Sequence, residues 1–199
     1  GDKNRLLACS SPTGPAFEGA QISAGQRAAA GAIERVRIDP DTLVARFKVI
    51  GSDLWSDEPG FIEETSKFGV TGICGSGIIE VVAEMYLSGI VTVDGIIDGE
   101  LASRSPLVVA DGRTWSYVLY QSDLTENQAP ILVTQNDIRQ IQLAKAALYA
   151  GVKLLMDKLD IDHVDRIRLA GAFGSHINVQ HAMVLGLIPD CALNQVSSA

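Results

Sequence analysis

The chain of 199 residues is 47% hydrophobic and 20% charged, which is enough for one well-buried core or at most two small ones. It contains no run of about eighteen apolar residues and no secretory signal at its start, so we expect a soluble protein that does not cross a membrane. A formal net charge of −8, with sixteen lysines and arginines scattered along the chain, disfavours nucleic acid as a partner.

The three cysteines, Cys9, Cys74 and Cys191, lie far apart and form no CxxC pair. This spacing favours neither a disulfide framework nor a zinc or iron–sulfur site, so we expect small buried apolar residues in a reducing, cytoplasmic setting. We expect residues 1–199 to form a single α/β lobe. Because the sequence does not begin with Met, we also expect this lobe to be part of a longer polypeptide.

The first third of the chain predicts three extended segments. Residues 5–10 form a short apolar run before a Ser-, Pro- and Gly-rich stretch, which predicts the end of a strand that leads into a loop. Residues 32–38 and 43–50 are β-prone and flank Asp39-Pro40-Asp41-Thr42, a sequence typical of a tight turn, so they predict a hairpin. Residues 51–68 are polar and predict a loop with one short helical turn.

A glycine-rich segment at 72–77, with the sequence GICGSG, precedes apolar residues at helical spacing. It predicts a glycine loop that opens an amphipathic helix, with Glu80 and Glu84 on the opposite face from the apolar residues. Ser88 and Gly89 are expected to end this helix.

The second half predicts one long helix between strands. Residues 115–121 alternate like a strand, and residues 131–133 are expected to pair nearby. Thr134 and Asp137 have the spacing of a capping box, and helical periodicity continues to Lys158.

The last part of the chain predicts a strand, a glycine turn and a helix in direct succession. Residues 165–170 predict a buried, central strand that runs into a glycine turn at 171–175, and residues 179–187 predict a helix. The polar tail from residue 189 predicts a frayed segment or an end at which the sequence is cut from a longer polypeptide.

Both glycine loops precede a helix, where backbone N–H groups converge and can bind a phosphate. The first loop lacks the lysine of a P-loop, and the second, with the sequence LAGAFG, does not match GxGxxG, so neither P-loop nor Rossmann chemistry is favoured. Tight packing of a helix against a strand explains each loop equally well when it is taken alone, and this alternative stays open.

Isolated polar residues add weaker candidates. Glu18, within the sequence GPAFEG, could hold a ribose hydroxyl, a magnesium-bound water or a backbone N–H. Lys145 on the long helix could reach a phosphate or lie on a solvated face. His176 and His181 are five residues apart, a spacing that disfavours a shared metal and favours surface or capping roles, which we also expect for His163.

Five segments together resemble the C-terminal domain of the reductive activators of corrinoid proteins. They are 8–19 (ACSSPTGPAFEG), 72–77 (GICGSG), 137–151 (DIRQIQLAKAALYAG), 169–177 (LAGAFGSHI) and 186–189 (GLIP). That family is similar to the acetate and sugar kinase, chaperone and actin superfamily (ASKHA). The resemblance therefore implies an RNase-H-like α/β lobe with a mixed sheet and flanking helices, one of two lobes that clamp ATP and magnesium.

The resemblance also implies where a nucleotide binds. An adenosine motif would contain Gly171, Ala172, Phe173 and Gly174, and a second nucleotide-facing loop would contain Gly72, Gly75, Ser76 and Gly77. Glu18 and Lys145 complete the set of candidate ligand-binding residues, and no metal ligand is identified.

Members of that family carry a ferredoxin-like region with a [2Fe–2S] cluster ahead of this domain. They couple ATP use to electron delivery onto an inactive cob(II)amide, so the implied partner is a corrinoid protein, and a homodimer is compatible with the resemblance. The superfamily's Asp-x-Gly-Thr phosphate motif is absent from this sequence. We therefore expect the catalytic carboxylates to lie outside it and the chain alone to hydrolyse ATP negligibly.

Two alternatives remain open at this point. One is a small-molecule kinase of the same superfamily, which would need a substrate-binding acid near the phosphate loops. The other is a non-catalytic docking or dimerisation module whose conformation a nucleotide sets.

Overall fold

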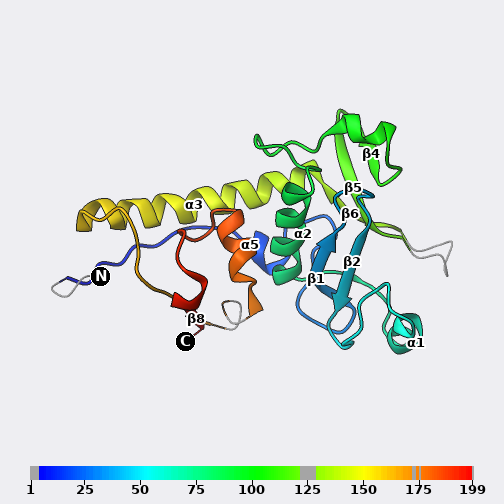
Figure 1. Cartoon of the computed structure of the whole chain (residues 1–199), viewed down its shortest axis with the longest axis horizontal. Helices are drawn as coiled ribbons and strands as arrows, with labels where there is room; N and C mark the ends of the chain where they lie inside the picture. The colour runs from blue at the N-terminus through cyan, green and yellow to red at the C-terminus, as the bar shows by residue number, and fades with distance from the viewer. Residues whose placement is uncertain (1–4, 122–128, 172–173, 175, 199) are drawn as a thin grey trace.

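The computed structural model describes residues 5–121, 129–171, 174 and 176–198 (Figure 1). The fold is mixed α/β, with small sheets and packed helices. The strands are β1 (Ala32–Ile38), β2 (Ala45–Val49), β3 (Gly72–Ile73), β4 (Val108–Asp111), β5 (Thr114–Tyr120), β6 (Ile131–Thr134), β7 (Ile167–Leu169) and β8 (Val196–Ser198). The α-helices are α1 (Phe61–Thr65), α2 (Gly75–Leu87), α3 (Gln135–Leu159) and α5 (Val179–Val184), and 3-10 turns are η1 (Ala16–Glu18), η2 (Gly99–Ser103) and η3 (Leu193–Gln195).

The predicted hairpin is confirmed as β1 and β2, which pair antiparallel. Asp39 shapes its turn, because one carboxylate oxygen accepts hydrogen bonds from the backbone N–H and the hydroxyl of Thr42, both at 2.8 Å. Leu43 closes the turn with a φ of 62°. This local hydrogen bonding explains why the turn could be predicted from sequence.

Helix α2 packs against the mixed sheet β2-β1-β3, in which β3 runs parallel to β1. Ten of its thirteen residues are buried, including Glu80 and Glu84. The predicted helix and its end at Ser88 are confirmed, but the expectation that these two glutamates form a polar face is wrong. The helix is covered by the sheet on one side and by α5 on another, and its carboxylates have buried partners.

A second sheet, in the order β4-β5-β6, is antiparallel throughout and confirms the predicted strands near 115–121 and 131–133. Tyr117 of β5 is fully buried, and its hydroxyl donates to the carbonyl oxygen of Leu43 at 2.7 Å. Phe47 of β2 contacts the ring of Tyr120 edge-on, with ring centroids 5.3 Å apart. The two sheets thus share one hydrophobic core.

Helix α3 begins with the predicted capping box, in which the Thr134 hydroxyl accepts from the Asp137 N–H and the Asp137 carboxylate accepts from the Thr134 N–H. Figure 1 shows the helix as a long rod, with the N-terminal segment running beside it. Gly151 makes this approach possible, since a Cβ atom there would lie 2.2 Å from the Ser11 hydroxyl oxygen. None of the helices within the described residues is long and apolar enough to cross a membrane.

The C-terminal part differs from the prediction in two ways. Strand β7 is partly exposed and, among the described residues, pairs in parallel only with β8, so the expectation of a buried, central strand is wrong. Of the two alternatives given for the tail, a frayed segment or a cut end, the first is wrong, because the tail contains η3 and β8. Helix α5 confirms the predicted second helix and lies against α2.

Two further expectations from the sequence are wrong. Residues 5–10 form no strand. Of the cysteines only Cys74 is buried, whereas Cys9 is exposed and Cys191 is intermediate, so residue type did not predict their burial.

Candidate functional site

The first glycine loop, Glu18 and the segment after η1 meet at a cavity of ≈ 370 Å³. This volume lies within the range of about 300–1,000 Å³ that is typical of small-molecule sites. The residues that line it come from five separate stretches of the chain and are Phe17, Glu18, Gln26, Arg27, Ala28, Ile50, Cys74, Gly75, Ser76 and His176. Below it is called the Glu18–Ser76 cavity.

Hydrogen bonds to β3 fix the segment that forms much of this cavity's wall. The N–H of Gln26 donates to the carbonyl oxygen of Ile73 at 2.9 Å, and the N–H of Ile73 donates to the carbonyl of Ala24 at 2.8 Å. Gly19 packs directly on the same segment, because a Cβ atom at Gly19 would lie 2.7 Å from the backbone N and O of Gln26. Since Gly19 also has a φ of 83°, another residue there would be strained as well as crowded.

Asp137 holds the start of the same segment, at Ser23. One of its carboxylate oxygens accepts from the N–H of Ser23 at 2.8 Å and from the Ser23 hydroxyl at 3.1 Å. The same side chain completes the capping box of α3 and is buried. The start of α3 and the cavity wall are therefore positioned together.

The glycines of the first loop have different surroundings. Gly72 and Gly77 have packing roles: a Cβ at Gly72 would lie 2.7 Å from the carbonyl oxygen of Ala24, and one at Gly77 would lie 2.2 Å from that of Ile33. Gly75 and Ser76 instead line the cavity. Helix–strand packing therefore accounts for Gly72 and Gly77, whereas the ligand-binding role of Gly75 and Ser76 stays a prediction.

The start of α2 carries polar groups at the cavity. The Ser76 hydroxyl lies 3.3 Å from the thiol of Cys74, which also donates to the carbonyl oxygen of Ile33. Cys74 is the N-cap residue, but its side chain makes no capping hydrogen bond. Backbone N–H groups in the first turn of a helix carry partial positive charge, which favours an anion here.

The second glycine loop is only partly described. Ala172 and Phe173 lie outside the described residues, and Gly171 has a φ of 91° with open space where a Cβ would stand. Gly174 does not have a positive φ, and a Cβ there would lie 3.1 Å from atoms of Leu169. His176, which follows this loop, lines the Glu18–Ser76 cavity. The proposed adenosine role of the loop remains a prediction.

Lys145 lies elsewhere. It is exposed and lines two other pockets. One, of ≈ 350 Å³, lies between α3, α5 and the segment that follows α5. The other, of ≈ 160 Å³, lies between α2, α3, α5 and the turn after α2. Its side chain passes close to Gly186, where a Cβ would lie 3.2 Å from the Lys145 Cε. The structure therefore brings Glu18, Gly75 and Ser76 together but does not bring Lys145 to the same cavity.

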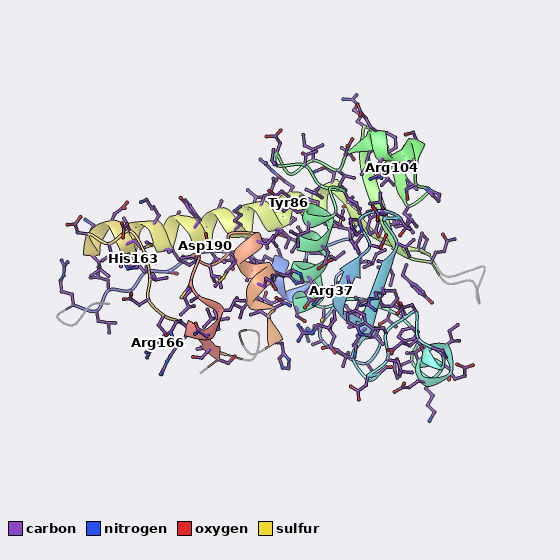
Figure 2. All side chains as sticks on the ribbon, in the orientation of Figure 1. Arg37, Tyr86, Arg104, His163, Arg166 and Asp190 are labelled. Atoms are coloured by element: carbon purple, nitrogen blue, oxygen red, sulfur yellow. The ribbon has the colours of Figure 1, made fainter. Side chains whose placement is uncertain are left out.

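A buried network of charges, which the sequence did not reveal, joins β1, α2 and α5 (Figure 2 labels Arg37). The Glu80 carboxylate has no exposed surface and accepts hydrogen bonds from Arg35 and Arg37, both at 2.8 Å. Glu84 accepts from the ring Nε2 of His181 at 2.8 Å. The imidazole is buried, so the expectation of a surface or capping role for His181 is wrong, whereas His163 and His176 are exposed.

The two glutamates also satisfy the backbone of β1 beyond its short pairing with β3. The N–H of Val36 donates to Glu80 and that of Ile38 donates to Glu84, both at 3.0 Å. The signal that could have predicted this network is a pair of arginines two residues apart on a strand, Arg35 and Arg37, together with two glutamates one turn apart on a helix.

The carboxyl group of Glu84 has a pKa below its ordinary value. Burial raises this pKa, but the hydrogen bond from His181, the N–H of Ile38 and the charges of His181 and Arg37 lower it by more. Glu84 is thus held as a carboxylate between α2 and α5. The His181–Glu84 hydrogen bond fixes α5, the helix that follows the second glycine loop, against the helix that starts at the cavity.

Within the described ranges, no three His, Cys, Asp or Glu side chains lie close enough together to hold a metal ion. The Glu18–Ser76 cavity, in contrast, fits an organic anion, because its lining combines apolar side chains with Arg27 and Ser76.

Comparison with known proteins decides the family. The model of a protein family described as the C-terminal domain of RACo, the ASKHA domain, matches residues 1–199. This chain belongs to that family. The suspected resemblance is thereby confirmed, and the packed α/β arrangement described above is that of an ASKHA domain of the RACo family.

Individual relatives agree with this assignment. The chain is 32% identical over 196 residues to the corrinoid activation enzyme RamQ of Eubacterium limosum. The matched region covers 95% of this chain and 30% of that protein. It is 26% identical over 199 residues to a [Co(II) methylated amine-specific corrinoid protein] reductase of Methanosarcina barkeri, which covers 95% of this chain and 32% of that protein.

A solved structure matches as well. A reductive activator for corrinoid, iron–sulfur protein is 33% identical and matches with a TM-score of 0.76. The matched region covers 93% of this chain and 27% of the chain of that structure. This RACo-family ASKHA domain therefore spans about a third of the length of the relatives it matches.

Proposed function

We propose that this chain is the nucleotide-binding lobe of a longer protein that couples ATP use to the reductive activation of a corrinoid protein. The match of the whole chain to the ASKHA domain of RACo carries this proposal. The names of the relatives support it, since they describe corrinoid activation and the reduction of a Co(II) corrinoid protein.

The geometry of the Glu18–Ser76 cavity supports the nucleotide part of the proposal. Its lining offers apolar surface for a base from Phe17 and Ile50, an acid for hydroxyl groups in Glu18, and a cation in Arg27. A nucleoside phosphate carries a partner for each of these three: a base, hydroxyl groups and phosphate oxygens. The first turn of α2, at Gly75 and Ser76, adds backbone N–H groups on the same cavity.

Hydrolysis needs groups that the described residues of this lobe do not supply. Phosphoryl transfer depends on the positioning of phosphates and magnesium, yet the sequence has no Asp-x-Gly-Thr motif and the described residues hold no cluster of metal ligands. We therefore place the carboxylates that bind magnesium, and the [2Fe–2S] cluster of the electron-transfer step, in other parts of the longer protein. The role of this lobe is to bind and orient the nucleotide.

The experiment is a calorimetric titration of the full-length protein with ATP, with and without the Co(II) form of its corrinoid partner, combined with an assay for Co(I) formation. We expect ATP binding, and Co(I) formation that depends on ATP and an electron donor. ATP binding with phosphate transfer to a small molecule would favour a kinase. Partner binding that is indifferent to ATP would favour a docking module, and the absence of ATP binding would refute the proposal.

A further inference from the structure

We propose that Arg27 binds the phosphate groups of the nucleotide in the Glu18–Ser76 cavity. This inference rests on the proposed function and assigns a ligand group to a residue that belongs to neither glycine loop. Arg27 lines the cavity and is exposed. Among the cavity's described lining residues it is the one lysine or arginine.

The guanidinium of Arg27 is available for a ligand. Within the described part of the chain it has no hydrogen-bond or ion-pair partner, whereas Arg35 and Arg37 are both occupied by Glu80. A free guanidinium presents five N–H donors in a planar fork that matches two phosphate oxygens at once. A lysine would offer only a point charge, so the residue type suits phosphate.

The backbone that carries Arg27 is fixed in place. The preceding residue, Gln26, donates its N–H to Ile73 at 2.9 Å, and Gly25 forms a parallel bridge with the same residue. Ser23, three residues earlier still, is bound by the buried Asp137. The side chain therefore extends from a rigid attachment point, so little backbone order has to be gained when it binds.

The charges around the cavity favour a nucleotide over a free phosphate ion. Glu18 lies in the same lining as Arg27, and its carboxylate would repel an isolated anion but can accept hydrogen bonds from hydroxyl or amino groups. A ligand that satisfies both residues must carry an anionic part and a donor part, joined by a body that fills the apolar surface of Phe17 and Ile50. Nucleoside phosphates have this composition.

The test compares phosphate-bearing and phosphate-free ligands in the full-length protein. Calorimetry would measure the affinities of ATP, ADP and adenosine for the wild type, Arg27→Ala and Arg27→Lys. Arg104→Ala is the matched control, because it removes the same charge from an exposed site at the end of η2, away from α2 (Figure 2). Melting curves of each variant would report whether its fold is retained.

We expect Arg27→Ala to weaken ATP and ADP binding about 10- to 100-fold while changing adenosine binding by less than about twofold, since a charge-assisted hydrogen bond contributes on that scale. The ATP affinity of Arg27→Lys should fall between those of the wild type and Arg27→Ala, and the ATP affinity of Arg104→Ala should match that of the wild type.

Equal losses for ATP and adenosine would show that Arg27 acts on the nucleoside or on the fold, and would overturn the assignment. Unchanged ATP affinity in Arg27→Ala would overturn it while leaving the proposed function intact. Failure of the wild type to bind any of the three ligands would instead refute the proposed function, and this inference with it.

Discussion

Replacing Glu80 with glutamine is expected to lower the free energy of unfolding by about 2 kcal/mol. The substitution keeps the size of the side chain but removes its charge and turns one acceptor atom into a donor. In the native protein both carboxylate oxygens of Glu80 accept hydrogen bonds, from Arg35, from Arg37 and from the N–H of Val36. An amide cannot accept all three, so at least one donor must lose its partner.

The size of the effect follows from the exposure of the partners. Breaking a fully buried ion pair costs about 3–5 kcal/mol, because the remaining charge is left without compensation. Here the side chains of Arg35 and Arg37 are 35% and 39% exposed, so a released guanidinium can turn toward water. The loss then consists of one hydrogen bond to a charged group, about 1.5–3 kcal/mol, and the weakening of a second.

Urea denaturation of the 199-residue chain, followed by circular dichroism, would measure this change. With a slope of about 2 kcal/mol per molar urea, 2 kcal/mol corresponds to a shift of about 1 M in the midpoint, and the slope itself should not change. The matched control is Glu64→Gln on α1, where the glutamate is exposed and a change within about 0.5 kcal/mol is expected. If Glu80→Gln behaved like this control, the network would contribute nothing measurable and the reasoning would be refuted.

Three further changes test other contacts. Because the pKa of Glu84 is held below its ordinary value of 4.5, the carboxylate stabilises the fold above that pH. The free energy of unfolding of the wild type should therefore decline as the pH falls below about 4.5. Urea titrations at several pH values should show less of this decline for Glu84→Gln. Burial raises the pKa of Tyr117, so wild-type stability should decline above about pH 10. Tyr117→Phe should abolish that alkaline decline and cost about 1–2 kcal/mol at neutral pH, because the carbonyl of Leu43 loses its donor. Gly77→Ala should lower the melting temperature and cost more than about 2 kcal/mol, since its Cβ would lie 2.2 Å from a backbone oxygen of Ile33; an unchanged melting temperature would show that α2 can shift at no cost.

The features that the sequence predicted well are those determined by neighbouring residues. The start of α3 was predicted because Thr134 and Asp137 bond to each other's backbone, and the hairpin was predicted because Asp39 bonds to the turn that follows it. Contacts of this kind span three residues. They depend on local geometry and are therefore visible as a pattern in the chain.

The features that were missed depend on residues far apart in the sequence. Glu80 and Glu84 have the spacing of a solvated helix face, and their burial becomes visible only when β1 brings Arg35 and Arg37 against α2. In β7 the alternation of apolar and polar residues correctly predicted a strand. Such alternation indicates which side chains of a strand can be buried, but it does not indicate which other element buries them.

The candidate site shows the same division. Glycine patterns pointed to Gly75 and Ser76, and Glu18 was singled out as an isolated acid; all three line one cavity. Gln26 and Arg27 were missed because no glycine motif contains them, and their position depends on hydrogen bonds to β3.

The two carboxylates of α2 also affect how this protein can associate with others. A strand whose N–H groups point outward can accept a strand from another molecule, which is a common first step of aggregation. On β1 the N–H groups of Val36 and Ile38 are already bound by Glu80 and Glu84. A foreign strand would have to displace two buried or nearly buried carboxylates to pair there, so this part of the sheet is protected against strand addition while the lobe stays folded.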